Sequence, residues 1–253
     1  MQFNQVLIFD IESEYGHFRK FNTTTSPLTY SFPTRPALVG LLSAILGIER
    51  EVSAGVFSKG TVPLSELFAK KSAGIAVQIL RPVSKVNIAF NLLDTEKRAS
   101  SFFNVKQRTQ VEFELLKNPM FRIFVSMADD TLFKSLCEKV RNNASHFTPY
   151  LGLSQFTATM CYRDVANITG VATDLSTEVV SAVNISELDQ NDPIQFNYSS
   201  DFKYTADTMP VAMKSDRQVV EYAEVVIETN GRSIYVKSDN IKKVEGYGNI
   251  IFL

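Results

Sequence analysis

The sequence lacks tryptophan, has only two cysteines and two histidines, and carries a net charge of −1 over 253 residues. The absence of tryptophan has no functional weight. Cys137 and Cys161 have no partner at a metal-binding spacing, so we expect buried thiols in a reducing cytosol. No run approaches the roughly 18 apolar residues of a membrane span, and the N-terminus does not resemble a signal peptide. A cytoplasmic protein without a membrane segment is therefore expected.

Motifs of common enzymes are also missing. There is no P-loop, no GxGxxG, no GxSxG and no HExxH. Glu12 and Glu14 are paired carboxylates, but nothing near them specifies a metal. His17 with Arg19 or Lys20 is the one arrangement that could serve a metal-independent ribonuclease, as a general base beside a cation. No cofactor and no metal are predicted.

Charge is distributed unevenly although the total is near zero. Residues 70–122 hold ten Lys or Arg against four Asp or Glu, whereas residues 170–230 hold three against eleven. A basic middle and an acidic C-terminal part are consistent with one face for a polyanion and another for solvent or a basic partner. Uneven but solvated surface explains the charge pattern equally well.

Hydrophobic patterns predict an alternation of strands and helices in the first 169 residues. The helix after the first strand is well delimited: Thr34 can cap it, Pro36 suits its first turn and Gly47 can end it. Gly40 inside it indicates either close approach of another backbone or simple tolerance. A second helix is expected to be capped by Asp130. The predicted strands are Val6–Ile11, Gly74–Leu80, Phe121–Met127 and Ala158–Val165.

The resulting fold class is α+β. We predict a ferredoxin-like or RRM-like β-α-β-β-α-β domain over 1–169, with an inserted β-hairpin thumb at about 82–119. A smaller all-β C-terminal part is predicted over 170–253, with the acidic segment 189–216 as loop. Its expected strands are Val179–Ile185, Glu221–Thr229 and Arg232–Val236, and Asn230-Gly231 is expected to join the last two as a tight hairpin.

Four segments combine side chains that RNA needs: cations for phosphates, hydroxyl or amide donors, and flat rings for unstacked bases. Each also has a purely structural interpretation, as a solvated loop, a helix cap or a small satellite core. The candidates are Tyr15, His17, Phe18, Arg19, Lys20 and Thr25 after the first strand; Tyr30, Thr34 and Arg35 at the helix start; Arg81, Lys106 and Arg108 on the arm; and Tyr150, Ser154 and Gln155 in a later loop.

Taken together, these segments resemble the fifth CRISPR-associated (Cas) protein family, with closest similarity to type I-B systems. The resemblance is carried by Tyr15-Gly16-His17-Phe18-Arg19-Lys20, Thr23-Thr24-Thr25, Leu28-Thr29-Tyr30, Phe32-Pro33-Thr34-Arg35, Gly40 to Gly47 and Tyr150-Leu151-Gly152-Leu153-Ser154.

The resemblance implies a subunit of the Cascade surveillance complex that binds the 5′ repeat-derived handle of the CRISPR RNA (crRNA). It also implies contacts with a backbone subunit and the large subunit, and with target DNA only through the complex. In type I-C systems the family member cuts precursor RNA with a Tyr and an adjacent Lys-His pair. Tyr30 could stand for that Tyr, but the pair is absent, since His146 follows Ser145. A non-cutting RNA-holding subunit is therefore expected, with an endoribonuclease or a protein-docking scaffold as the alternatives.

Overall fold

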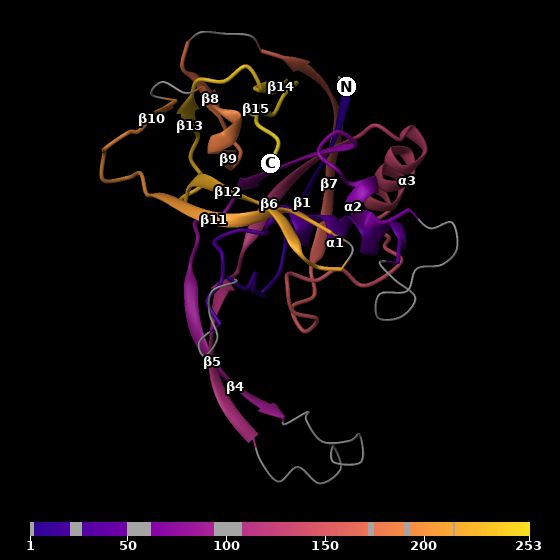
Figure 1. Ribbon diagram of the computed structural model, residues 1–253, viewed down its shortest axis with the longest axis vertical. Helices are drawn as coiled ribbons and strands as arrows, with labels where there is room; N and C mark the ends of the chain where they lie inside the picture. Colours follow the sequence, from indigo (N-terminus) through magenta and orange to yellow (C-terminus); the bar gives the residue numbers. More distant parts are fainter. Residues whose placement is uncertain are drawn as a thin grey trace.

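Strands dominate the computed structural model, which describes residues 3–20, 27–49, 62–93, 108–171, 175–189, 193–214 and 216–253 (Figure 1). The largest sheet is antiparallel throughout and has the order β15-β14-β7-β1-β6-β3. Its members are β1 (Gln5–Glu12), β3 (Ala73–Ile79), β6 (Met120–Met127), β7 (Thr159–Gly170), β14 (Lys242–Val244) and β15 (Gly248–Ile250). The four strands predicted in the first 169 residues are thus present at the expected positions.

Helix α1 (Arg35–Leu46) begins and ends as predicted. The Thr34 hydroxyl accepts a hydrogen bond from the Ala37 N–H at 3.4 Å, and Gly47 ends the helix with φ at +81°. Helix α2 (Leu64–Leu67) is a single turn, and α3 (Asp130–Arg141) is the second predicted helix.

The predicted cap of α3 was wrong by one residue. Asp129, not Asp130, adopts the extended conformation before the helix, and its carboxylate accepts from the N–H groups of Thr131 and Leu132. Asp130 lies in the first turn, where its charge also favours the helix start.

The two cysteines differ in exposure. Cys137 on α3 is partly buried, whereas Cys161 on β7 is exposed, so the expectation of two buried thiols was wrong for Cys161. Within the described residues, no helix is both long and apolar enough to cross a membrane.

The central strand β1 of the main sheet is buried on both of its faces. Leu7, Phe9 and Ile11 of β1 belong to the core that includes the apolar sides of α1 and α3. Val6 and Ile8 point to the opposite face, where they pack in a second cluster. This explains why β1 reads as an uninterrupted apolar run rather than as an alternating strand.

The predicted arm is a β-hairpin of β4 (Lys85–Leu93) and β5 (Arg108–Lys117), paired in register along all of β4. Figure 1 shows it projecting away from the body of the protein. Its base is held by β2 (Tyr15–Gly16), which pairs with Lys117 and Leu116 of β5. The N-terminal segment is therefore part of the arm's foundation.

The C-terminal part contains two small sheets, and three predictions for it were wrong. The strand expected at Val179–Ile185 is divided into two short strands, β8 (Thr177–Val179) and β9 (Val183–Asn184), which lie in different sheets. Segment 189–216 was expected to be loop, but β11 (Tyr204–Met213) lies in it and pairs with β12 (Val219–Glu228). The expected hairpin across Asn230-Gly231 does not form, because β12 and β13 (Ile234–Val236) lie in different sheets. The sheets are β10-β13-β8 and β11-β12-β9, with β10 at Ile194–Gln195.

The Glu228 carboxylate explains the course of the chain after β12. This side chain is 3% exposed and accepts hydrogen bonds from the N–H groups of Asn230, Arg232 and Lys203. Gly231 has φ at +83°, and a Cβ there would lie 2.5 Å from the Ile79 carbonyl oxygen. The Asn-Gly turn thus redirects the chain from one sheet to another, past the end of β3.

Candidate RNA interface

His17 lies where three chain segments meet. The backbone N–H of His17 donates to the Leu151 carbonyl at 3.0 Å, and the ring Nδ1 lies 2.9 Å from the Glu114 carbonyl oxygen on the arm. The ring packs edge-on against Phe113 at 5.3 Å. On its other side, Gly152 lies so close that a Cβ would be 1.7 Å from the His17 carbonyl oxygen. Three of the four segments chosen from the sequence therefore converge at the base of the arm.

Glu114 fastens the N-terminal segment to the arm a second time. Its N–H donates to the Pro27 carbonyl at 3.0 Å, and its carboxylate accepts from the Thr29 N–H at 3.0 Å. Lys85 on the neighbouring strand donates to the same carboxylate at 3.0 Å and to the Thr29 carbonyl at 2.8 Å. Sequence reasoning missed Glu114, because a carboxylate in a basic arm gives no local signal of such long-range partners.

His17 itself is not at the surface. It is 4% exposed, and burial lowers its pKa below 6.5, with the nearby Arg19 acting in the same direction. The Glu114 carbonyl can only accept, so the neutral ring carries its proton on Nδ1. Its Nε2 is buried and has no hydrogen-bond partner within the described part of the chain. In this position His17 is a neutral side chain that connects the N-terminal segment, the arm and the Tyr150–Gln155 loop, rather than a cationic phosphate ligand.

Lys20 and Tyr30 face the C-terminal strand β11. The Lys20 ammonium forms an ion pair with Asp207 and lies 5.4 Å from the centre of the Tyr30 ring. The Tyr30 hydroxyl donates to the Thr208 carbonyl at 3.0 Å. Tyr30 is 2% exposed, and burial raises its pKa to about 12. Both candidates thus connect the N-terminal segment to β11, Lys20 through the Asp207 carboxylate and Tyr30 through the Thr208 carbonyl.

A polar cavity of about 470 Å³ opens beside the arm base. It brings together Arg81 and Gln155, two predicted RNA ligands, and its lining also includes Tyr15. Arg81 donates to the Asn118 carbonyl at 2.7 Å and lies 3.4 Å from the Glu12 carboxylate. The remaining exposed candidates around this base are Arg19, Tyr150 and Ser154.

Arg35 occupies a different place from the one expected for an RNA ligand. It is 4% exposed, and its NH2 group donates to the carbonyls of Phe68 at 2.8 Å and Ala73 at 2.9 Å. Thr34 is likewise buried and serves as the helix cap. The helix start is therefore packed against the segment before β3, apart from the arm base. Thr25, Lys106 and the side chain of Arg108 lie outside the described residues.

These features define a strand-rich α+β protein with a projecting β-hairpin whose base is tied to an N-terminal loop. The family described as CRISPR-associated protein (Cas_Cas5) matches residues 6–225, and the chain belongs to this family. The expected family membership is thus confirmed. No curated protein matches the chain at a significant level.

Solved structures resemble the chain at low sequence identity. A CRISPR protein from Archaeoglobus fulgidus is 13% identical with a TM-score of 0.50, and the match covers 98% of both chains. A chain of a CRISPR RNA-guided surveillance complex is 16% identical with a TM-score of 0.49, covering 90% of this chain and 91% of that one. A chain of a type III-B Cmr-beta complex bound to cognate target RNA is 14% identical with a TM-score of 0.49, covering 91% and 86%. The likeness is one of fold.

Proposed function

We propose that this protein is a non-cutting, RNA-holding subunit of a CRISPR surveillance complex, of type I and I-B-like. The 5′ repeat-derived handle of the crRNA would lie across the arm base, while a backbone subunit and the large subunit contact other surfaces. Target DNA would be met only through the complex. The observation that carries the proposal is the convergence at His17 of the N-terminal segment, the arm and the Tyr150–Gln155 loop.

The strand order supports the RRM-like part of this proposal. Strands β7-β1-β6-β3 lie side by side, with α1 between β1 and β3 in the chain and α3 between β6 and β7. This order supports the proposed ferredoxin-like β-α-β-β-α-β arrangement, with the arm inserted between its second and third strands. In such an arrangement a projecting hairpin and an adjacent loop offer a continuous surface to a single strand of RNA.

The burial of the two candidate catalytic side chains, His17 and Tyr30, supports RNA holding rather than RNA cutting. A general base needs access to the 2′-hydroxyl that it deprotonates. His17 and Tyr30 are 4% and 2% exposed, and both make hydrogen bonds to backbone carbonyls. The exposed basic side chains of the arm base, Arg19 and Arg81, are cations suited to binding RNA phosphates.

The test is binding of a fluorescent repeat-derived handle RNA across a salt titration. Arg19→Glu and Arg81→Glu should each weaken binding, and should reduce the slope of log affinity against log salt by about 1 for each phosphate that is no longer neutralised. Lys134→Glu, an equal charge change on the exposed side of α3, is the matched control. Equal affinities and slopes for all four proteins would contradict the proposed interface.

Cutting is tested by incubating the purified chain with uncut repeat RNA, which contains the handle and the sequence before it, in the absence of metal. We expect the RNA to remain intact. A cut at one position, made by the wild type and abolished in His17→Ala, would replace the holding proposal by the endoribonuclease alternative.

A further inference from the structure

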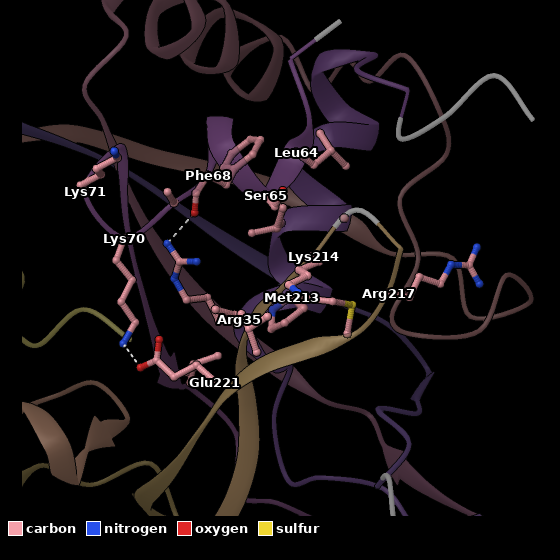
Figure 2. A pocket seen from close by; sticks show the side chains of 17 residues that line it. Arg35, Leu64, Ser65, Phe68, Lys70, Lys71, Met213, Lys214, Arg217 and Glu221 are labelled. Atoms are coloured by element: carbon pink, nitrogen blue, oxygen red, sulfur yellow. Dashed lines mark hydrogen bonds and ion pairs between the residues drawn. The ribbon is translucent and has the colours of Figure 1, made fainter. Parts of the chain in front are cut away.

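A second cavity, of about 500 Å³, lies between α1, α2 and the paired strands β11 and β12 (Figure 2). Its lining is mainly apolar and includes Val39, Leu64, Phe68, Val211 and Met213. This size and composition are typical of sites that bury a drug-sized ligand or a few side chains of a partner. None of the exposed RNA candidates of the arm base lines it.

Arg35 lines this cavity as a buried cation. Its NH2 group serves two backbone carbonyls, but its Nε has no hydrogen-bond partner among the described residues. The nearest favourable charge is Glu221, whose carboxylate accepts from Lys70 at 2.7 Å (Figure 2). Burial lowers the Arg35 pKa to about 10, and the charge of Glu221 acts in the opposite direction. Arg35 therefore adds a buried positive charge to the lining of the cavity.

The mouth of the cavity adds further positive charge and an apolar surface. Lys71, Lys214 and Arg217 are exposed there, and Val220 is 54% exposed. The cavity lining contains five cations, Arg35, Lys70, Lys71, Lys214 and Arg217, against the single carboxylate of Glu221. An occupant must therefore combine apolar bulk with more than one negative charge.

We propose that this cavity is the docking site for a segment of a protein partner in which bulky apolar side chains alternate with carboxylates. The apolar side chains of this segment would fill the space between α1 and β11, and its carboxylates would meet the cations that line the cavity and its mouth. A fatty acid carries a single charge and would leave Lys71 and Lys214 without a complement. Nucleic acid would leave the apolar lining unfilled. The inference is independent of RNA holding at the arm base.

Two positions allow the site to be altered without disturbing the fold. Gly40 lies within α1 and lines the cavity as well as a smaller one beside Tyr150 and Gly152, and a Cβ there meets nothing within 4 Å. Gly40→Leu should fill part of the space while improving helix propensity. Val220 is exposed, so Val220→Glu and Val220→Lys form a matched pair of opposite charge at the same point of the mouth.

Random short peptides from a display library are selected for binding to the full-length chain. The affinity of the selected peptides, here called the winners, is then measured for the wild type and for each variant. We expect winners that combine bulky apolar residues with carboxylates. Their affinity should fall about tenfold on Val220→Glu, equivalent to about 1.4 kcal/mol, and should be kept or improved on Val220→Lys. Gly40→Leu should abolish binding, and thermal melting should show that all three variants stay folded.

Other outcomes overturn the proposal. Winners that lack carboxylates, or that bind all variants equally, would place peptide binding elsewhere. If no peptide is enriched but decanoate binds and Gly40→Leu blocks it, the occupant is a small amphipathic acid. If neither probe binds, the cavity is not a docking site. None of these results bears on the handle RNA titration, so failure here and failure of the RNA proposal are distinguishable.

Discussion

Gly152 and His17 are in direct backbone contact, and no residue with a side chain fits at position 152. A Cβ on Gly152 would lie 1.7 Å from the His17 carbonyl oxygen and 2.6 Å from its carbonyl carbon. Gly152 also has φ at +90°, a conformation that residues with side chains rarely adopt. The Tyr150–Gln155 loop can therefore approach the N-terminal segment only because position 152 is glycine.

Gly152→Ala should lower the free energy of unfolding by about 2 kcal/mol or more, because both the clash and the positive φ oppose the substitution. Chemical denaturation monitored by circular dichroism measures this. Gly40→Ala is the matched control, since its Cβ meets nothing within 4 Å and α1 should gain about 0.5–1 kcal/mol. Equal stability of the two variants would contradict the described contact.

Arg35→Met should destabilise the protein by about 1–3 kcal/mol. The carbonyls of Phe68 and Ala73 would lose their donor in a buried place, and this loss outweighs the relief of removing a buried charge. Lys134→Met, at a residue whose side chain is 80% exposed, should change stability by about 0.5 kcal/mol or less. The difference between the two denaturation midpoints checks the prediction, and a neutral Arg35→Met would show that the carbonyls find other donors.

Asp10→Ala should cost about 2–4 kcal/mol, because it leaves two arginines of the main sheet without their shared anion. The Asp10 carboxylate is 2% exposed, and accepts from the Nε atoms of Arg122 and Arg163, both at 2.7 Å. Removing the buried anion leaves the half-buried Arg122 without its partner, whereas the exposed Arg163 is partly compensated by solvent. Asp10→Asn keeps the shape and one acceptor oxygen, so its loss should be smaller. A larger loss for Asn than for Ala would contradict the charge argument.

The local signals in the sequence were sufficient for the strands β1, β3, β6 and β7 of the main sheet and for α1 and α3, but not for the short strands β14 and β15. Thr34, Pro36 and Gly47 delimit α1 because capping and glycine conformation act within a few residues. Strand β11 was missed because Tyr204–Met213 includes Pro210 and several acidic or polar interruptions, and its pairing with β12 is irregular beyond Pro210. Edge strands tolerate such residues, but a propensity pattern does not reveal them.

The candidate site was predictable in its segments but not in the role of each side chain. Tyr15–Lys20, the arm and the Tyr150–Gln155 loop do come together. The sequence could not show that Lys20 pairs with Asp207 across 187 positions, or that Arg35 turns toward the carbonyls of Phe68 and Ala73. These are long-range contacts, and composition cannot distinguish a cation that serves the fold from one that serves a ligand.

Stability should decrease as the pH falls below 6.5, through the protonation of His17. Burial holds the folded-state pKa of His17 below the 6.5 of the unfolded chain. Above pH 6.5 the His17 ring is neutral in both the folded and the unfolded state, so its contribution to stability is constant. As the pH falls from 6.5 toward the lower folded-state pKa, only the unfolded state binds the proton, and stability is lost. The slope from one such group does not exceed about 1.4 kcal/mol per pH unit.

His17→Gln separates this effect from other titrations. A glutamine amide can still donate to the Glu114 carbonyl, but it does not titrate, so the pH dependence just below 6.5 should flatten while carboxylate effects at lower pH remain. Urea denaturation of both proteins at closely spaced pH values measures the difference. If the two stability profiles run parallel from about pH 7 downward, then His17 is not the buried neutral tie that the contacts with Glu114 and Leu151 describe.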